Sequence, residues 1–260
     1  MVSIRGKAIG AFGKVFGENE KAYKVAKKVY QTGVKIKGYN PKKNRKSLEG
    51  PVAIIRVNAD FSENGAKILK KLIKKYKIKP ILAVKMVDVV EDKKWQRIAK
   101  DLEKAGCELA LHGYHHSKKL PLLSGKQKEE EISLAVSSFK KYFKKSPKGF
   151  FASRNAYDIQ SLHMLKKYGI KYYAEMNNLY PEKHRGVWDI CLNRKLFDPL
   201  DWSLIPMSDH IIKRKGTLSV CWHLDKMRPN TVHLFEEYLD YLKENKIKTI
   251  NLSMLGRRLK

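Results

Sequence analysis

The chain of 260 residues is 43% hydrophobic, which is enough for one large core and argues against a disordered protein. Its 55 Lys and Arg against 26 Asp and Glu give a net charge of +29, which favours anionic partners such as nucleic acid, acidic lipid surfaces or phosphorylated glycans. No run approaches the roughly 20 apolar residues of a membrane span. The first residues lack the apolar core of a signal peptide, so we expect a cytoplasmic protein.

The first 49 residues differ from the rest, because they are poor in acidic residues and rich in Lys and Gly. We expect residues 1–49 to form a basic N-terminal extension and linker, ahead of a domain over residues 50–260. Small apolar residues at three- and four-residue steps predict a helix from Glu18 to about Thr32. It could pack on the domain, which we favour, or lie on a membrane surface and make the protein peripheral to the membrane.

Short apolar runs alternate with helical patterns from residue 51 onward. The predicted strands are 52–57, 80–84, 107–111, 149–153, 172–174, 218–222 and 247–252. The predicted helices are 63–76, 92–105, 126–143, 159–168 and 231–244, and residues 178–210 are expected to be irregular. This alternation predicts an α/β fold with a parallel sheet, closed or nearly closed. An open doubly wound sheet is the alternative.

Two further features of composition limit the choice of function. Cys107, Cys191 and Cys221 include no C-x-x-C pair, so we expect buried free thiols, not disulfides or a zinc knuckle. The lysines are scattered over helical faces and are not grouped with aromatic side chains. Nucleic acid is therefore not the favoured partner.

Chemically capable side chains follow several of the predicted strands. The carboxyl ends of parallel strands are where α/β folds place their chemistry. Asn58 and Asp60 follow the first strand, and His112 and His116 follow the third. Arg154 follows the fourth, and His223 ends a later one. Two neutral imidazoles and one carboxylate suit a divalent metal, so Asp60, His112 and His116 are the predicted ligands.

These patches resemble the motifs of the polysaccharide deacetylases that have the NodB homology domain. The resemblance covers roughly residues 51–252 and leaves the N-terminal extension outside. The motifs that carry it are Ile55-Arg56-Val57-Asn58-Ala59-Asp60-Phe61-Ser62, Leu111-His112-Gly113-Tyr114-His115-His116, Arg154-Asn155-Ala156-Tyr157, Val220-Cys221-Trp222-His223 and the pair Asp201-Trp202. The second is fairly specific, and all stand in the expected order. The resemblance implies a distorted (β/α)7-type barrel.

The resemblance also implies a function, the removal of acetyl groups from N-acetylated sugars of a glycan or glycan precursor. Asp60, His112 and His116 would hold a divalent metal, most plausibly zinc, which acidifies a water. His223 would protonate the departing amine, with Asp201 orienting it, although Asp198 competes for that part. Tyr157 and Trp202 are the expected substrate-binding residues. An anionic, phosphate-bearing glycan precursor would fit the charge.

Position 58 departs from the family pattern. In the family an Asp at this position acts as general base, whereas this chain has Asn58. Arg154, which in the family pairs with that Asp, would lose its charged partner. Three outcomes are left open. The protein could be a hydrolase that uses Asp88 or His115 as base, or a slow enzyme that relies on the metal. It could also be a catalytically impaired metal-containing domain that binds glycan or nucleic acid.

Overall fold

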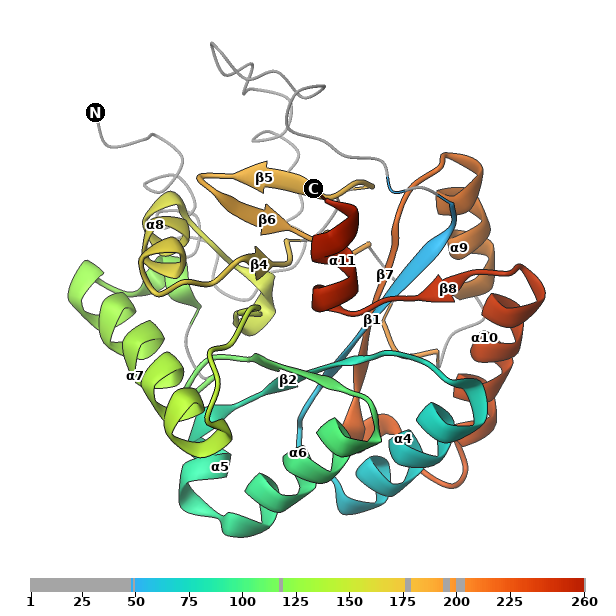
Figure 1. Cartoon of the computed structure of the whole chain (residues 1–260), viewed down its shortest axis with the longest axis horizontal. Coiled ribbons are helices and arrows are strands. Elements are labelled where there is room, and N and C mark those ends of the chain that lie inside the picture. Colours follow the sequence, from blue (N-terminus) through green and yellow to red (C-terminus); the bar gives the residue numbers. More distant parts are fainter. Residues whose placement is uncertain are drawn as a thin grey trace.

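The computed structural model describes residues 48, 50–116, 119–175, 179–193, 197–199 and 204–259. In this part of the chain, helices surround a central sheet (Figure 1). The strands are β1 (Val52–Asn58), β2 (Ile81–Val84), β3 (Glu108–Leu111), β4 (Tyr172–Tyr173), β5 (Glu182–His184), β6 (Val187–Asp189), β7 (Leu218–His223) and β8 (Lys248–Thr249). The α-helices are α4 (Glu63–Tyr76), α5 (Met86–Glu91), α6 (Lys93–Ala105), α7 (Gly125–Phe143), α8 (Ile159–Lys167), α9 (Leu204–Lys213), α10 (Val232–Glu244) and α11 (Leu252–Arg258). The helix predicted at Glu18 to Thr32 lies outside the described residues.

The main sheet has the strand order β3-β2-β1-β7, and all of these neighbours are parallel. The register places Asn58 beside His223 on one side and beside Ala83 on the other. β8 pairs with the first residues of β1. Every residue of β1 is buried, as expected for a central parallel strand covered on both faces. The parallel α/β fold expected from the sequence is therefore confirmed.

Beyond β3 the strands are joined less continuously. Single bridges link Leu111 to Phe150 and Gly149 to Tyr172, and a second sheet follows in the order β4-β6-β5. A backbone hydrogen bond of 3.2 Å from Asn193 to the carbonyl of Ser219 leads back to β7. Within the described residues, two laddered sheets are thus joined by single bridges and isolated backbone hydrogen bonds, and no continuous ladder closes a barrel.

The two faces of β1 contact different apolar clusters. Ala53, Ile55 and Val57 belong to the large cluster under the helices, whereas Val52 and Ile54 belong to a smaller inner cluster. Leu252 and Leu255 of α11 belong to the inner cluster too. Because β8, which precedes α11, pairs with the start of β1, α11 lies at the end of the sheet opposite the strand carboxyl ends.

Several helices form where the sequence predicts them. The helix over 63–76 is confirmed, with the Ser62 hydroxyl accepting a 3.1 Å hydrogen bond from the Gly65 amide. The helix over 126–143 is confirmed within one residue and carries a capping box at Ser124. Cys107, Cys191 and Cys221 are free and buried, as expected. None of the helices in the described ranges is long and apolar enough to cross a bilayer.

The expectation that residues 178–210 are irregular is wrong. β5 and β6 form a hairpin whose turn residues, Arg185 and Gly186, have φ of 52° and 89°. Strands of three residues carry too short an alternation to be recognised. α9 contains Pro206, but in its first turn, where the helix needs no amide donor. α11 was not predicted from the sequence; Asn251 caps it by accepting a 3.0 Å bond from the Met254 amide.

Candidate functional site

The end of β3 holds a buried histidine in a defined protonation state. His112 is 2% exposed, and its Nδ1 lies 2.5 Å from the carbonyl oxygen of Phe151. A carbonyl only accepts hydrogen bonds, so Nδ1 carries the proton. Nε2 is buried and has no hydrogen-bond partner among the described residues. Burial lowers the pKa of His112 well below its usual value, helped by the charges of His116 and Arg56, so the ring is neutral with a free Nε2 lone pair.

The loop after β3 turns back and places a second imidazole beside the first. Gly113 and His116 have positive φ, 86° and 62°, which reverse the chain. Glu131 of α7 fixes the loop by accepting bonds from the amides of Tyr114 at 2.6 Å and His115 at 3.0 Å. The ring centroids of His112 and His116 are 4.1 Å apart. The two rings therefore share one compartment at the end of β3.

The donor set at this end of the sheet fits a divalent metal in chemistry. Burial lowers the pKa of His116, while the nearby Asp60 carboxylate acts in the opposite direction. Two neutral imidazoles, one with a buried and unpartnered Nε2, and one carboxylate are ligands that zinc accepts. Within the described residues, however, no three His, Cys, Asp or Glu side chains stand together as a complete ligand group. The ligand roles of Asp60, His112 and His116 thus stay a prediction.

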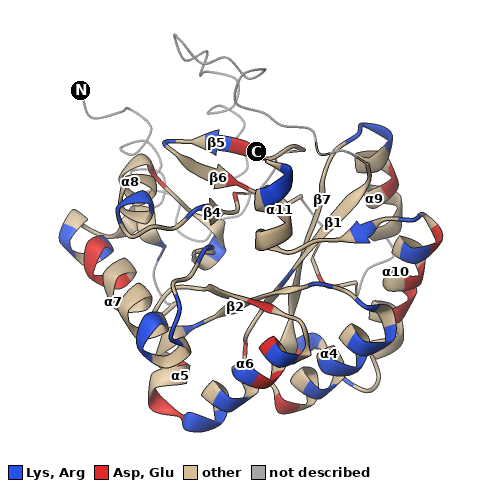
Figure 2. Cartoon of the chain, viewed as in Figure 1, with Lys and Arg blue, Asp and Glu red and all other residues tan. Residues whose placement is uncertain are grey.

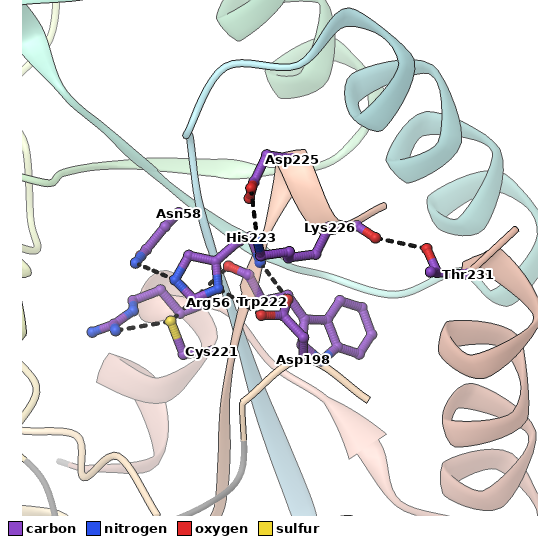
Figure 3. Close-up of polar contacts among 9 residues, drawn as sticks. All are labelled: Arg56, Asn58, Asp198, Cys221, Trp222, His223, Asp225, Lys226 and Thr231. Carbon is purple, nitrogen blue, oxygen red and sulfur yellow. Dashed lines mark hydrogen bonds and ion pairs between the residues drawn. The ribbon is translucent and has the colours of Figure 1, made fainter. Parts of the chain in front are cut away.

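The end of β7 holds a histidine in a contrasting environment (Figure 3). Asp198 accepts two bonds of 2.7 Å from His223, one from the backbone amide and one from Nδ1. On the other side of the ring, Nε2 lies 3.3 Å from Nδ2 of Asn58. Burial acts to lower the pKa of His223, but the bond and charge of Asp198 outweigh it, so the pKa is raised. His223 is thus held by a carboxylate at Nδ1 and faces Asn58 with Nε2.

Asp198 occupies the position beside His223 that the sequence assigned first to Asp201. The choice between them was open, since both lie within residues 178–210, where no elements were predicted. Asp201 and Trp202 lie outside the described residues. In the described part of the chain, the orienting carboxylate is Asp198.

Arg56 is a buried guanidinium beneath these histidines that sequence reasoning missed. It is 2% exposed and lies two residues before Asn58, on the same face of β1. Its Nη1 donates to Oδ1 of Asn155 at 2.8 Å, and its Nη2 lies 3.0 Å from the Cys221 sulfur (Figure 3). No carboxylate among the described residues forms an ion pair with it. A charged residue inside an otherwise apolar strand run was the signal that could have found it.

Residues 91–254 match the family model described as glycosyl hydrolase family 57. The chain belongs to glycosyl hydrolase family 57. The matched segment of this family 57 protein includes His112, His116 and His223, and it begins after Asn58 and Asp60. No curated protein matches the sequence.

Solved structures similar to this family 57 chain include members of the CE4 family. A CE4 family pseudoenzyme from Bacillus anthracis is 14% identical, with a TM-score of 0.59 over 84% of this chain and 68% of that one. A mutant of it with restored enzymatic activity is also 14% identical, with a TM-score of 0.60 over 84% of this chain and 70% of the mutant. The peptidoglycan deacetylase PdaC from Bacillus subtilis is 14% identical, with a TM-score of 0.56 over 81% of this chain and 92% of PdaC. The resemblance to polysaccharide deacetylases is therefore confirmed for the fold.

The other predicted residues of this family 57 chain have different surroundings. Arg154 is exposed, with a positive φ of 58°, and no bond joins it to Asn58 in the described structure. Tyr157 is buried, and its hydroxyl bridges the chain by donating to the Phe150 carbonyl at 2.8 Å and accepting from the Ala152 amide at 2.7 Å. That hydroxyl therefore holds the segment in which Arg154 sits. The substrate role of Tyr157 stays a prediction.

The two alternative bases each have a charged partner. Asp88 forms an ion pair of 3.0 Å with Lys85. His115 is exposed and its Nδ1 lies 3.0 Å from Oε2 of Glu131, on α7. Neither Asp88 nor His115 has a hydrogen bond to His112, His116 or His223 in the described structure. The assignment of Asn58 to the base position of the deacetylase motif stays a prediction.

Proposed function

We propose that the protein is a metal-dependent hydrolase of the deacetylase type, which removes acetyl groups from N-acetylated sugars of a glycan or glycan precursor. The observation that carries the proposal is that two histidines at the strand ends have pKa values shifted in opposite directions. His112 is neutral and has a free, buried Nε2. His223 is held by Asp198 and has a raised pKa. A metal ligand needs a neutral imidazole with a free nitrogen, as at His112, and an acid for a leaving amine needs a protonated imidazole, as His223 favours.

Asp60, His112 and His116 would hold the metal, with zinc the best match to two nitrogens and a carboxylate. When bound, the metal supplies Lewis acidity, which lowers the pKa of a water and polarises the acetamide carbonyl. The Phe151 carbonyl holds the His112 proton on Nδ1, so Nε2 is the ligand atom. Glu131 keeps the loop closed in the conformation that returns His116 to His112.

His223 carries the proton that the departing amine needs. Asp198 accepts from Nδ1, so the transferable proton of the imidazolium is the one on Nε2, the nitrogen that faces Asn58. Asp198 also raises the pKa of His223, which keeps more of the ring charged near neutral pH. An amide can donate to a neutral Nε2 or, turned over, accept from a protonated one. Asn58 therefore tolerates both states of His223.

Asn58 also gives the second candidate function. An amide cannot take a proton from water, and loss of a general base typically costs about 100- to 10,000-fold in rate. The chain would then be a catalytically impaired metal-containing domain that binds glycan, or nucleic acid, without turnover. The similarity to a CE4 family pseudoenzyme supports this alternative.

The test is acetate release from N-acetylglucosamine oligomers by the purified full chain. We expect slow release that a chelator abolishes and that added zinc restores. The matched control is His163→Ala, a change of an exposed histidine on α8, which should leave release unchanged. Zinc analysis of the same preparation should show metal bound at close to one ion per chain.

Two results would contradict the proposal in different ways. Glycan binding without any acetate, in a zinc-loaded protein, supports the impaired binding domain. New reducing ends without acetate indicate cleavage of the glycosidic bond, the reaction that the family name describes. That reaction uses two carboxylates on opposite sides of the bond. Asp198 is poorly suited to it, because both of its oxygens already accept bonds from His223.

A further inference from the structure

The outer faces of α4 and α6 carry two stripes of basic side chains. On α4 they recur at three- and four-residue steps, opposite the buried residues Leu69, Leu72 and Ile73. On α6 they also follow helical spacing, opposite Ala99 and Leu102. The members are Lys67, Lys70, Lys71, Lys74, Lys93, Arg97, Lys100 and Lys104, all of them exposed. The two helices pack against each other, so we call this surface the α4/α6 face (Figure 2).

The charges of the α4/α6 face are largely uncompensated. The carboxylates Glu63 and Glu103 of these helices pair with Lys94 and Lys145, which do not belong to the face. No ion pair of the eight members is found within the described residues. The exposed carboxylates of the two helices and their first turns, Glu63, Asp92 and Asp101, are outnumbered by the eight basic members. The face is therefore strongly positive.

Other helices of the same molecule do not share this pattern. The outer side of α10 is mainly acidic and includes Glu237, Asp240 and Glu244. α7 alternates Lys126 and Lys140 with Glu130 and the exposed Leu134. Charge that only aids solubility needs no particular placement. The concentration of unpaired lysines on two neighbouring helices, beside an acidic one, indicates a partner for this face.

We propose that the α4/α6 face binds the surface of a membrane rich in anionic lipid headgroups. On α4 the stripe runs from Lys67 to Lys74, so it extends over about 10 Å along the helix. Each Lys or Arg held near such a surface strengthens binding roughly fivefold. Long lysine side chains on two parallel helices can all reach one flat, diffuse layer of negative charge. The proposal is independent of the deacetylase function.

The composition of the face favours lipid over nucleic acid. Seven of its eight members are Lys, and Arg is the residue suited to bidentate contacts with phosphates. No aromatic side chain stands among them to stack on bases. Trp95, which lies on α6, has its ring stacked on Phe61 at a centroid distance of 4.7 Å.

The test is sedimentation of the full chain with lipid vesicles. One set contains phosphatidylglycerol mixed into phosphatidylcholine, and the other contains phosphatidylcholine alone. The face variant combines Lys70→Glu, Lys74→Glu, Lys100→Glu and Lys104→Glu. The control variant combines Lys126→Glu, Lys140→Glu, Lys213→Glu and Lys243→Glu, which are exposed residues of α7, α9 and α10 and change the net charge equally. Circular dichroism confirms that both variants are folded.

We expect the parent to bind the anionic vesicles, weakly at high salt, and not the phosphatidylcholine vesicles. The face variant should bind at least about tenfold more weakly, and the control variant within about twofold of the parent. Equal weakening of both variants, or no binding by the parent, would overturn the proposal. Tighter binding of the parent to a duplex oligonucleotide than to the vesicles, with the same loss in the face variant, would replace the membrane by nucleic acid.

Discussion

The ends of β3 and β7 present the same side chain with opposite properties. His112 donates from Nδ1 to a backbone carbonyl and is fully buried, and its pKa is lowered. His223 donates from Nδ1 to a carboxylate and is partly exposed, and its pKa is raised. Both partners fix the same tautomer, and both bonds favour the charged ring, but at His112 complete burial and the charges of His116 and Arg56 outweigh the bond, whereas the Asp198 carboxylate adds a full negative charge beside His223. Burial and the charges around each ring, with Asp198 the largest favourable charge at His223, therefore set the two histidines in opposite pKa directions.

The largest expected effect is at the β3 end. His112→Ala removes the free Nε2, and we expect zinc affinity to fall by more than about 100-fold, since loss of a partner that only orients a ligand already costs 10- to 100-fold. Acetate release should fall in parallel. The measurement is zinc binding by competition with a coloured chelator, and His163→Ala is the control. Unchanged zinc affinity would mean that the β3 end is not the metal site.

The next effect separates the β7 end from the metal. Asp198→Asn keeps the size of the side chain but removes its charge, so the pKa of His223 should fall. We expect acetate release near neutral pH to drop by about 10- to 100-fold while zinc binding is unchanged. Asp225→Asn, whose parent carboxylate pairs with Lys226, is the matched control. Loss of zinc from Asp198→Asn would contradict the assignment of metal binding to the β3 end and of proton transfer to the β7 end.

A gain of activity is expected from a third change. Asn58→Asp places a carboxylate where the deacetylase motif has its base, without altering the size of the side chain, and the buried cation Arg56 lies two residues away on the same face of β1. We expect acetate release to rise at least about tenfold. Asn58→Ala is the control and should show no gain. If Asn58→Asp binds zinc and releases no more acetate than the parent, the base lies elsewhere or the protein is a binding domain.

The smallest effect concerns stability and pH. A raised pKa in the folded state means that His223 adds stability below its unfolded pKa of about 6.5 and loses it as the pH rises through the folded pKa. His223→Gln should therefore lower the Tm by about 2 °C near pH 6 and by less at pH 8. The lowered pKa of His112 works in the opposite direction, since its stability is lost as the pH falls. Thermal melts across this range measure both. A His223→Gln deficit that grows toward pH 8 would contradict the assignment.

The sequence predicted the site unevenly, for a physical reason. His112, His116 and His223 could be placed because strand ends are visible as the last residues of apolar runs. Asp198 could not be chosen over Asp201, since only the folded chain shows which carboxylate meets Nδ1. Arg56 was passed over because its partners Asn155 and Cys221 are 99 and 165 residues away. Spacing along the chain carries no information about such contacts.

The fold shows the same division between local and distant causes. α4 and α7 were predictable because their caps, Ser62 and Ser124, and their apolar stripes are local. The fourth predicted strand, 149–153, was only half right. Its residues make single bridges, and the chain then turns at Arg154 and Asn155, which have positive φ of 58° and 50°. That turn is held by the Tyr157 hydroxyl, a contact that no periodicity reports.

The position of β1 in the sheet has a consequence during synthesis of the chain. Its first partner, β2, follows directly after α4, whereas β7, its partner on the other edge, contributes His223 only 165 residues after Asn58. A nascent chain can therefore pair β1, β2 and β3 early and must wait for β7. Until then one edge of β1 is unpaired, and an open edge strand invites association with other chains. The step that relieves this exposure is also the one that brings Asn58 and His223 together, so a chain cut before β7 has neither a protected sheet nor a complete site.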